Sequence, residues 1–265
     1  MFNRPPQTYD MAPGLVENIV KEEANPLNRI CALIPDGSTV LDIGAGNGLM
    51  ALLLKKHGKQ VIIDGIEPSP EAAALASRHY RHFYTGYAQD FAQKITETDY
   101  DFIILADVIE HMADPLTFLR DLSSRISDRT RLVLSVPNVA FGAVRLALLG
   151  GRFDYVDSGL LERTHLRFFT LATLERIIRE IGMNAEKIYF LRRDIFSTEI
   201  DLRSLRVNPF CLGRMSRDEL AWTYQFLLVL TREPVATERR SFGKKGFLPL
   251  LRHVLRKTFI PKTKE

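Results

Sequence analysis

Cysteine and tryptophan are scarce in this chain of 265 residues, which contains two cysteines and one tryptophan. Cys31 and Cys211 lie far apart inside apolar segments and have no metal-ligand spacing. We therefore exclude a disulfide framework and expect buried free thiols. No run approaches the roughly 18 apolar residues that a membrane span needs, and residues 1–6 carry no apolar signal segment. We expect a cytoplasmic protein with neither an export signal nor a membrane span.

The net charge of +4 is unevenly distributed along the chain. Residues 236–265 contain nine Lys and Arg residues against two acids, a local charge of +7, so the remaining 235 residues sum to −3. A mildly acidic body gives no reason to expect a nucleic-acid partner. Residues 242–259 interleave basic and apolar side chains, which fits peripheral contact with an anionic membrane, docking on an acidic partner, or an extension without a binding role.

Apolar strand patterns alternate with helical patterns through the rest of the chain, which predicts an α/β fold with a doubly wound, mostly parallel sheet. Residues 139–169 and 195–222 follow neither period well, and we expect them to form lid or insert segments. We predict one domain over residues 1–235, followed by a basic tail over residues 236–265. The expected strands are residues 40–43, 61–66, 83–85, 100–106, 131–136, 186–191 and 225–231.

A glycine-rich turn follows the first of these strands directly. Gly44, Gly46 and Gly48 lie at alternate positions, where the missing Cβ atoms allow a sharp turn and let a ligand lie against the main chain. No lysine follows in the position that a phosphate-binding P-loop requires. The next strand leads to Glu67, and an acid there suits hydrogen bonds to the hydroxyls of a ribose. These features together predict a nucleoside-binding site.

Residues 42–48, Glu67 and the Asp-Val-Ile-Glu-His segment 107–111 resemble the class I S-adenosylmethionine-dependent methyltransferases, over about residues 30–235. The segments 135–138 and 163–170 are similar to a subgroup often associated with bacterial surface-polysaccharide biosynthesis. This resemblance implies a seven-stranded sheet in the order 3-2-1-4-5-7-6, with the last strand antiparallel, and S-adenosylmethionine as the cofactor.

The resemblance also implies roles for individual residues. Asp42 and the glycine turn would hold the amino and carboxylate end of the cofactor, Glu67 would bind the ribose, and the loop after the third strand would flank the adenine. Tyr87 stands where the family often has an aspartate that reaches the adenine amino group. The candidate cofactor residues are Asp42, Gly44, Gly46, Gly48, Glu67, Gln89, Asp90 and Asp107.

Methyl transfer from a sulfonium requires alignment of the acceptor and, for a hydroxyl, removal of its proton. His111 has a suitable pKa for this base, and Asp107 joins it as a catalytic candidate. Asp107, Glu110 and His111 are similar to an acid-x-x-Glu-His cluster that holds a divalent ion in ubiquinone-pathway O-methyltransferases and small-RNA 2′-O-methyltransferases. We assign no metal from the sequence, because Asp107 is one methylene shorter and further ligands are not identified. Glu110 and His111 could instead brace the following helix.

Four residues near the predicted lid are candidates for substrate contact. Asn138 follows the fifth strand, and Arg163, His165 and Arg167 form a basic cluster suited to a phosphate or carboxylate. The alternative is a solvated loop that docks on the core through its aromatic residues.

The predicted function is therefore O-methylation of a sugar or cell-surface glycan precursor, with a small-molecule or lipid-linked saccharide as acceptor. One alternative is metal-assisted O-methylation of a quinone-like or lipid-soluble acceptor, for which magnesium-dependent activity would be the sign. Another is a non-catalytic partner subunit that binds the cofactor.

Overall fold

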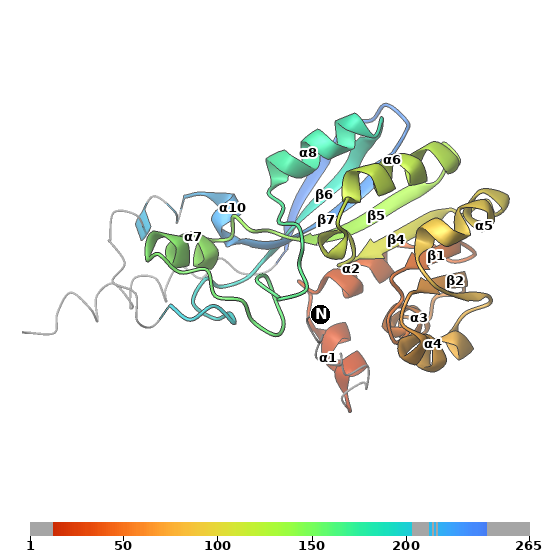
Figure 1. Cartoon of the computed structure of the whole chain (residues 1–265), viewed down its shortest axis with the longest axis horizontal. Coiled ribbons are helices and arrows are strands. Elements are labelled where there is room, and N and C mark those ends of the chain that lie inside the picture. Colours follow the sequence, from red (N-terminus) through yellow and green to blue (C-terminus); the bar gives the residue numbers. More distant parts are fainter. Residues whose placement is uncertain (1–12, 203–211, 214, 216, 243–265) are drawn as a thin grey trace, which may run out of the picture.

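The computed structural model describes residues 13–202, 212, 213, 215 and 217–242. These residues form one eight-stranded sheet with helices on both faces (Figure 1). The strands are β1 (Thr39–Ile43), β2 (Ile62–Glu67), β3 (Phe83–Thr85), β4 (Phe102–Ala106), β5 (Arg131–Pro137), β6 (Asn184–Arg192), β7 (Thr223–Thr231) and β8 (Glu238–Phe242). The helices are α1 (Leu15–Lys21), α2 (Pro26–Leu33), α3 (Leu49–Lys56), α4 (Pro70–Ala76), α5 (Ala92–Glu97), α6 (Pro115–Arg125), α7 (Gly142–Leu149), α8 (Leu171–Glu180) and α10 (Glu219–Trp222), with short 3-10 helices η1 (Ser77–His79), η2 (Ala88–Phe91) and η3 (Ile109–His111).

The strand order is β3-β2-β1-β4-β5-β7-β6-β8. Strands β1 to β5 pair in parallel, whereas β7 runs antiparallel to both β5 and β6. The predicted order of the first seven strands and the antiparallel last member are confirmed. Within the described residues no helix is both long and apolar enough to cross a membrane.

Strand β8 is an addition that the sequence analysis missed. It pairs in parallel with β6, from Lys187 opposite Glu238 to Leu191 opposite Phe242. The ring of Phe242 lies 5.6 Å from that of Tyr189, and the guanidinium of Arg29 lies 4.1 Å above it. The sheet therefore extends into the segment predicted as a tail from residue 236. Residues 243–265, which carry most of the basic amphipathic pattern, lie outside the described residues.

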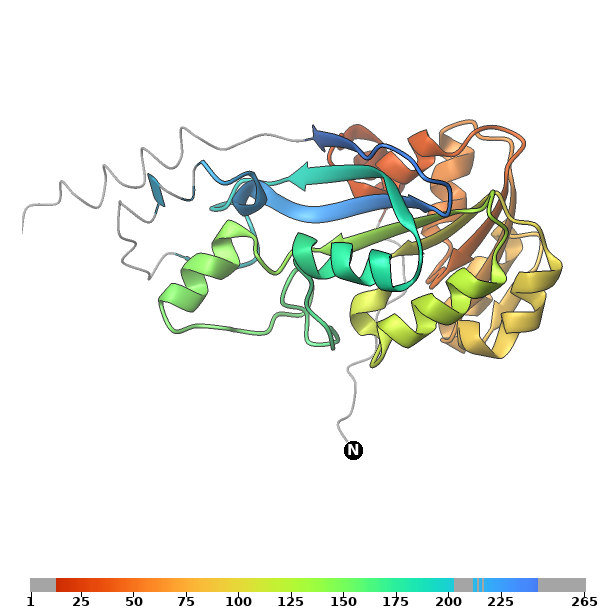
Figure 2. The same cartoon turned by 90° about the horizontal axis from the view of Figure 1, so that it is seen from above.

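Each face of the sheet has its own apolar core because the strand residues alternate in direction. On β1, Val40 packs with the buried residues of α1, α2 and α3, whereas Leu41 and Ile43 pack with those of α6 and α8. Figure 2 shows the sheet between these two sets of helices. Cys31 is fully buried in the first core, as predicted, and Cys211 lies outside the described residues.

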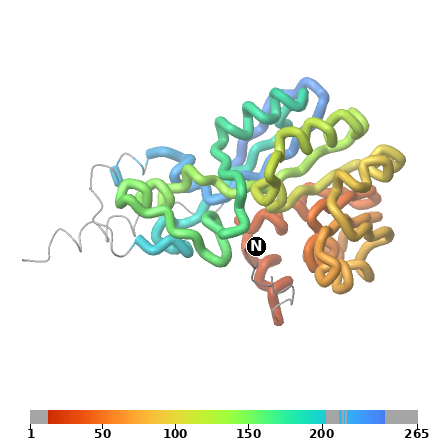
Figure 3. Tube along the Cα trace, viewed as in Figure 1, coloured from red at the N-terminus to blue at the C-terminus, as the bar shows by residue number. Residues whose placement is uncertain are grey.

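A third apolar cluster lies beside the sheet and joins the two predicted lid segments. It contains α7, Leu160 and Leu161 from the first segment, and Ile195 and Trp222 from the second. Figure 3 shows these segments side by side, beyond the end of β5. The segment from α7 to residue 169 is thereby held over the carboxyl ends of the central strands, where ligands bind in sheets of this kind.

Candidate functional site

The glycine turn after β1 is closed by contacts that only glycine permits. Gly44, Gly46 and Gly48 have φ values of 76°, 52° and 87°, a region that disfavours residues with a Cβ. A Cβ on Gly44 would lie 2.6 Å from Cγ2 of Val108, and one on Gly48 would lie 3.1 Å from Cα of Ala76. The turn therefore packs tightly against the residues that follow β4.

Glu67, at the end of β2, holds this turn in place. Its Oε2 accepts a hydrogen bond of 2.9 Å from the Gly46 N–H, and its Oε1 accepts one of 2.9 Å from the Ser69 N–H. The side chain is buried, with 7% of the residue exposed. Each carboxylate oxygen has a second lone pair, so Glu67 retains the capacity to accept bonds from two ribose hydroxyls. Its predicted ribose contact stays a prediction.

Asp42 lies on β1 directly below the turn and is 3% exposed. The hydroxyl of Tyr80 donates to its Oδ2 over 2.7 Å. Burial raises the pKa of Asp42 to about 7, because the Tyr80 hydrogen bond offsets the loss of solvation only in part and the Glu67 carboxylate adds repulsion. An ammonium group bound here would favour the ionised carboxylate, which suits the predicted contact with the amino end of the cofactor.

The predicted adenine residues lie on the 3-10 helix η2. Oδ2 of Asp90 accepts a hydrogen bond of 3.2 Å from the Tyr87 N–H, so its carboxylate stabilises the start of this helix. Gln89, Asp90 and Tyr87 are all exposed. The adenine contact of Gln89 and Asp90 stays a prediction.

Asp107 follows β4 and is held by the two strands beyond it. Its φ of 56° is left-handed, which no other non-glycine residue shows in the described part of the chain. Its Oδ1 accepts hydrogen bonds from the Ser135 hydroxyl, at 3.2 Å, and from the Gln225 side-chain amide. Asp107 is accessible to solvent, yet the protein packed around its carboxyl raises the pKa of this group, and the Glu162 carboxylate raises it further.

Glu110, His111 and His165 form a compact cluster of metal-ligating groups. One ligand atom from each lies within 4.8 Å of the others. Glu110 is 1% exposed, neither of its carboxylate oxygens accepts a hydrogen bond among the described residues, and its carboxyl lies beside that of Asp107. Burial, followed by the neighbouring Asp107 carboxylate, raises the pKa of Glu110 well above its ordinary value. The cluster therefore holds a buried acid that lacks a compensating charge.

The two imidazoles of this cluster are oriented by main-chain carbonyls. Nδ1 of His111 lies 3.2 Å from the Thr164 oxygen, and Nδ1 of His165 lies 3.1 Å from the Leu160 oxygen. A carbonyl oxygen only accepts, so each Nδ1 carries the proton and each Nε2 is the basic nitrogen. The rings meet edge to face with their centroids 4.8 Å apart. Burial lowers the pKa of His165, which favours its neutral form. His165 was predicted as a substrate residue, and the structure places it in this cluster.

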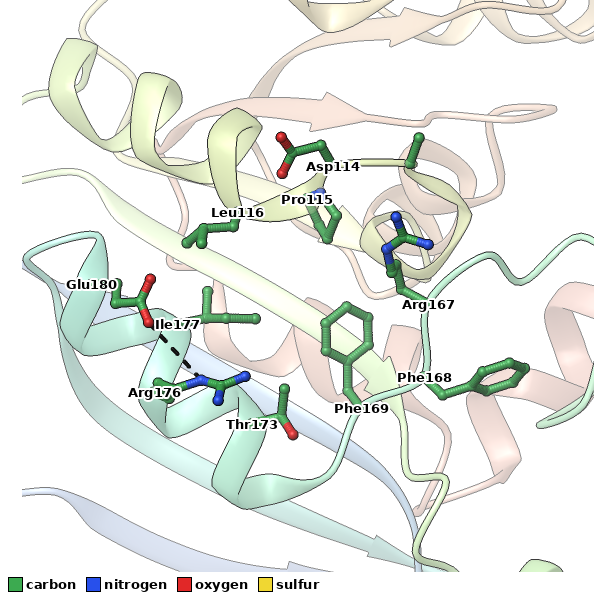
Figure 4. A pocket seen from close by; sticks show the side chains of 11 residues that line it. Asp114, Pro115, Leu116, Arg167, Phe168, Phe169, Thr173, Arg176, Ile177 and Glu180 are labelled. Atoms are coloured by element: carbon green, nitrogen blue, oxygen red, sulfur yellow. Dashed lines mark ion pairs between the residues drawn. The ribbon is translucent and has the colours of Figure 1, made fainter.

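The segment that carries His165 is tied to η3 through the main chain. The N–H groups of Leu166 and Arg167 both donate to the Glu110 carbonyl oxygen, at 2.8 and 3.0 Å. The Arg167 side chain lines a cavity of about 480 Å³ between α6 and α8 (Figure 4). None of the three cluster residues lines this cavity. The predicted joint action of Arg167 and His165 on one anion is therefore not supported.

Asn138 has a structural role that the sequence analysis did not anticipate. Its side-chain amide donates to the carbonyl oxygens of Leu220, at 3.0 Å, and Thr223, at 2.7 Å. Its Oδ1 accepts from the Ala140 N–H at 3.0 Å, and the residue is fully buried. These bonds join the end of β5 to α10, and the substrate contact of Asn138 stays a prediction.

Arg163 is likewise engaged within the lid. Its Nε lies 2.9 Å from Oδ1 of Asp157, and the arginine side chain is 62% exposed. An exposed pair of this kind contributes little to stability. The substrate contact of Arg163 stays a prediction.

Four further residues belong to the site and were missed: Tyr80, Ser135, Glu162 and Gln225. Gln225 had a signal in the sequence, because it is a polar residue at the start of an apolar strand. Tyr80 and Glu162 had no such signal, since only the fold brings them to the site. Tyr80 bonds to Asp42, and Glu162 lies near the carboxyl groups of Asp107 and Glu110.

A model of the methyltransferase domain family matches residues 18–188, which is more than half of the chain. The chain belongs to the methyltransferase domain family. It is 27% identical over 185 residues to a ubiquinone biosynthesis O-methyltransferase of Azorhizobium caulinodans, covering 67% of this chain and 72% of that one. A namesake from Cereibacter sphaeroides is 26% identical over 186 residues, covering 66% and 73%.

Solved structures share the fold at low sequence identity. A SAM-dependent methyltransferase from Archaeoglobus fulgidus superposes with a TM-score of 0.56 at 17% identity, covering 78% of this chain and 92% of that one. Magnesium protoporphyrin IX methyltransferase from Synechocystis, solved with bound SAH, gives a TM-score of 0.52 at 16% identity, covering 84% and 90%. The predicted methyltransferase fold, enzyme class and cofactor agree with these comparisons. None of the relatives named here is a polysaccharide enzyme.

Proposed function

We propose that this chain is an S-adenosylmethionine-dependent O-methyltransferase whose acceptor hydroxyl is activated beside a divalent cation held by Glu110, His111 and His165. The observation that carries the proposal is the Glu110 carboxylate, which is buried beside the Asp107 carboxyl, accepts no hydrogen bond among the described residues and faces two imidazoles. A buried acid of this kind is costly unless a positive charge compensates it. A cation would supply that charge.

The cofactor half of the site also fits its ligand. No described atom lies within 4 Å of a Cβ placed on Gly46, so the main chain of the turn is open there. Glu67 offers paired acceptors, and the buried Asp42 carboxylate suits an ammonium group. These residues would hold the methionine end and the ribose of the cofactor. S-adenosylmethionine supplies the methyl group that the acceptor oxygen receives in an in-line displacement.

The donor set indicates which cation would bind. Two imidazoles and one carboxylate suit Zn²⁺, Mn²⁺ or Co²⁺, whereas Mg²⁺ prefers oxygen ligands. Magnesium-dependent activity, which the sequence analysis gave as the sign of the metal-assisted alternative, therefore suits this donor set less well than manganese or zinc dependence. A bound cation of this kind lowers the pKa of a coordinated hydroxyl. If the site works without a cation, Nε2 of His111 is the nitrogen that can accept the hydroxyl proton.

For the acceptor, we favour a phenol or quinol of lipid-soluble type over a sugar. The two sequence relatives described above are ubiquinone biosynthesis O-methyltransferases. The sugar prediction rested on the resemblance of segments 135–138 and 163–170 to a subgroup associated with polysaccharide biosynthesis, and these two relatives do not belong to such a pathway. The basic sequence 242–259 supports peripheral contact with an anionic membrane, where such an acceptor would dissolve.

Calorimetric titration of the metal-stripped protein with Mn²⁺ and Zn²⁺ tests the proposal. We expect binding that Glu110→Gln and His165→Gln each weaken at least about tenfold, since each variant removes one of three ligands. His82→Gln is the matched control, because His82 is exposed and lies outside the cluster. Equal binding by the unaltered protein and all three variants would contradict the proposed cation site.

Turnover is measured separately, as S-adenosylhomocysteine formed from S-adenosylmethionine with 3,4-dihydroxybenzoate as a probe acceptor. We expect turnover that a chelator abolishes and Mn²⁺ or Zn²⁺ restores. Tight S-adenosylhomocysteine binding with no turnover on phenols or sugars would favour the non-catalytic partner subunit. Turnover that survives chelation would favour His111 as the base.

A further inference from the structure

Asp107 is held by a polar network that spans three adjacent strands. Gln225 of β7 lies opposite Pro137 of β5, and its side-chain Nε2 reaches past β5 to Oδ1 of Asp107 and to the Ser135 hydroxyl, at 3.3 Å from the latter. The Ser135 hydroxyl donates to the same Oδ1, and the Asp107 N–H lies 3.1 Å from that hydroxyl oxygen. Both side-chain donors thus bond to Oδ1 of Asp107. These two bonds fix the orientation of the carboxylate and therefore of its Oδ2.

The backbone of Asp107 shows that this orientation is imposed. A left-handed φ of 56° is unfavourable for a residue with a side chain and persists only where the surroundings enforce it. The Asp107 N–H is bonded to Ser135, through both the main-chain oxygen at 3.2 Å and the hydroxyl. Backbone and side chain are therefore fixed by the same two neighbouring strands.

The next residue locates Asp107 relative to the cofactor half of the site. Val108 packs against Gly44 so closely that a Cβ on the glycine would lie 2.6 Å from it. The glycine turn is the element that would hold the amino-acid end of the cofactor. Asp107 therefore directly precedes the residue that packs on this turn.

Resting on the proposed function, we infer that Gln225 is a positioning residue for the cofactor: it fixes the Asp107 carboxylate so that the remaining oxygen accepts the α-ammonium of S-adenosylmethionine. The glutamine amide is suited to this because it donates without adding charge. It is also buried, with 6% of the residue exposed, so solvent does not compete for the bond. Asp107 is not one of the three cluster residues, although its carboxyl lies beside that of Glu110.

The test compares two ligands that differ only at the end Asp107 is inferred to hold. S-adenosylhomocysteine carries the α-ammonium, whereas 5′-methylthioadenosine lacks the whole amino-acid end. For Gln225→Met, which keeps the length of the side chain and removes the donor, we expect S-adenosylhomocysteine to bind at least tenfold more weakly. Binding of 5′-methylthioadenosine should change less than twofold. Gln93→Met is the matched control, because Gln93 is exposed and its side-chain amide donates to Glu97, away from Asp107.

A loss of affinity for both ligands alike, or for neither, would overturn the inference. So would weaker Mn²⁺ binding with unchanged S-adenosylhomocysteine binding, because Asp107 would then serve the cation. If Gln225→Met fails to fold, Ser135→Ala removes the second donor to the same oxygen and should weaken S-adenosylhomocysteine alone, by about threefold. Absence of S-adenosylhomocysteine binding to the unaltered protein would instead refute the proposed function, so the two failures are distinguishable.

Discussion

The two halves of the site are built in different ways. In the cofactor half, the candidate residues apart from Asp107 lie within residues 42–90, and the turn at their centre is held by glycine conformations and by Glu67. In the acceptor half, the groups are side chains from distant segments. His111 meets the Thr164 carbonyl across 53 residues, and its ring lies edge to face with that of His165.

This difference decides how each half responds to substitution. A site made from a local turn depends on backbone conformation, so a single Cβ in the wrong place disrupts it. A site made from distant side chains depends on the lid and on β7 being in place, and its members are replaceable one at a time. Substitutions in each half test that contrast.

The largest effect is expected for Gly44→Ala. The new Cβ would meet Val108 at 2.6 Å with φ at 76°, so we expect about 2–4 kcal/mol of destabilisation and about 100-fold weaker S-adenosylhomocysteine binding. Gly58→Ala is the control, because its φ is 72° and nothing lies within 4 Å of the added Cβ. Urea unfolding and calorimetry measure both quantities. Equal behaviour of the two variants would show that the turn does not depend on the Val108 contact.

Asn138→Ala should affect stability and spare the cofactor. It removes three hydrogen bonds of a fully buried amide, which we expect to cost about 2–4 kcal/mol in the free energy of unfolding. Affinity for S-adenosylhomocysteine should stay within about twofold, because the residue joins β5 to α10 outside the turn. Asn184→Ala, at an exposed position, provides the comparison in urea unfolding. Reduced turnover without loss of stability would restore Asn138 as a substrate residue.

Asp42→Asn should stabilise the cofactor-free protein at alkaline pH. The folded pKa of Asp42, about 7, exceeds its ordinary value of 3.8, so ionisation opposes folding. The free energy of unfolding therefore falls as the pH rises from about 4 to about 7 and stays low above that range. We expect the asparagine variant to be about 1–3 kcal/mol more stable at pH 8 and no more stable at pH 4. Urea unfolding at both values checks this, and a less stable variant at pH 8 would contradict it.

The smallest effect is expected for Arg163→Gln. The exposed pair with Asp157 should contribute less than about 0.5 kcal/mol, and turnover of the probe acceptor should be unchanged. Thermal unfolding and steady-state kinetics are the measurements. A several-fold rise in KM would return Arg163 to the acceptor site, as its sequence neighbours first suggested.

Local signals in the sequence predicted the central sheet and the cofactor half well. The first seven strands and their order follow from apolar patterns and from the family resemblance, and the glycine turn follows from its three glycines. Strand β8 was not predicted, because its sequence Glu-Arg-Arg-Ser-Phe shows no alternation of apolar and polar residues. It lies at the edge of the sheet and pairs only with β6. Its basic residues led to the prediction of a tail.

The acceptor half could not be predicted in the same way, since its contacts are made by the fold. His165 lies between arginines in the sequence, which suggested an anion site, but the carbonyl of Leu160 turns its ring toward His111. The contact between Gln225 and Asp107 could not be predicted for the same reason. The sequence shows Gln225 as a polar residue in an apolar strand, but it does not show which residue Gln225 bonds to.

The most direct test of the two-part site is titration of S-adenosylhomocysteine into the unaltered protein, Glu67→Ala and His165→Ala, side by side. We predict micromolar binding that Glu67→Ala weakens at least about tenfold, or about 1.4 kcal/mol, and that His165→Ala leaves within twofold. Equal losses in both variants would contradict the separation of the two halves. No binding to the unaltered protein would contradict the cofactor site itself.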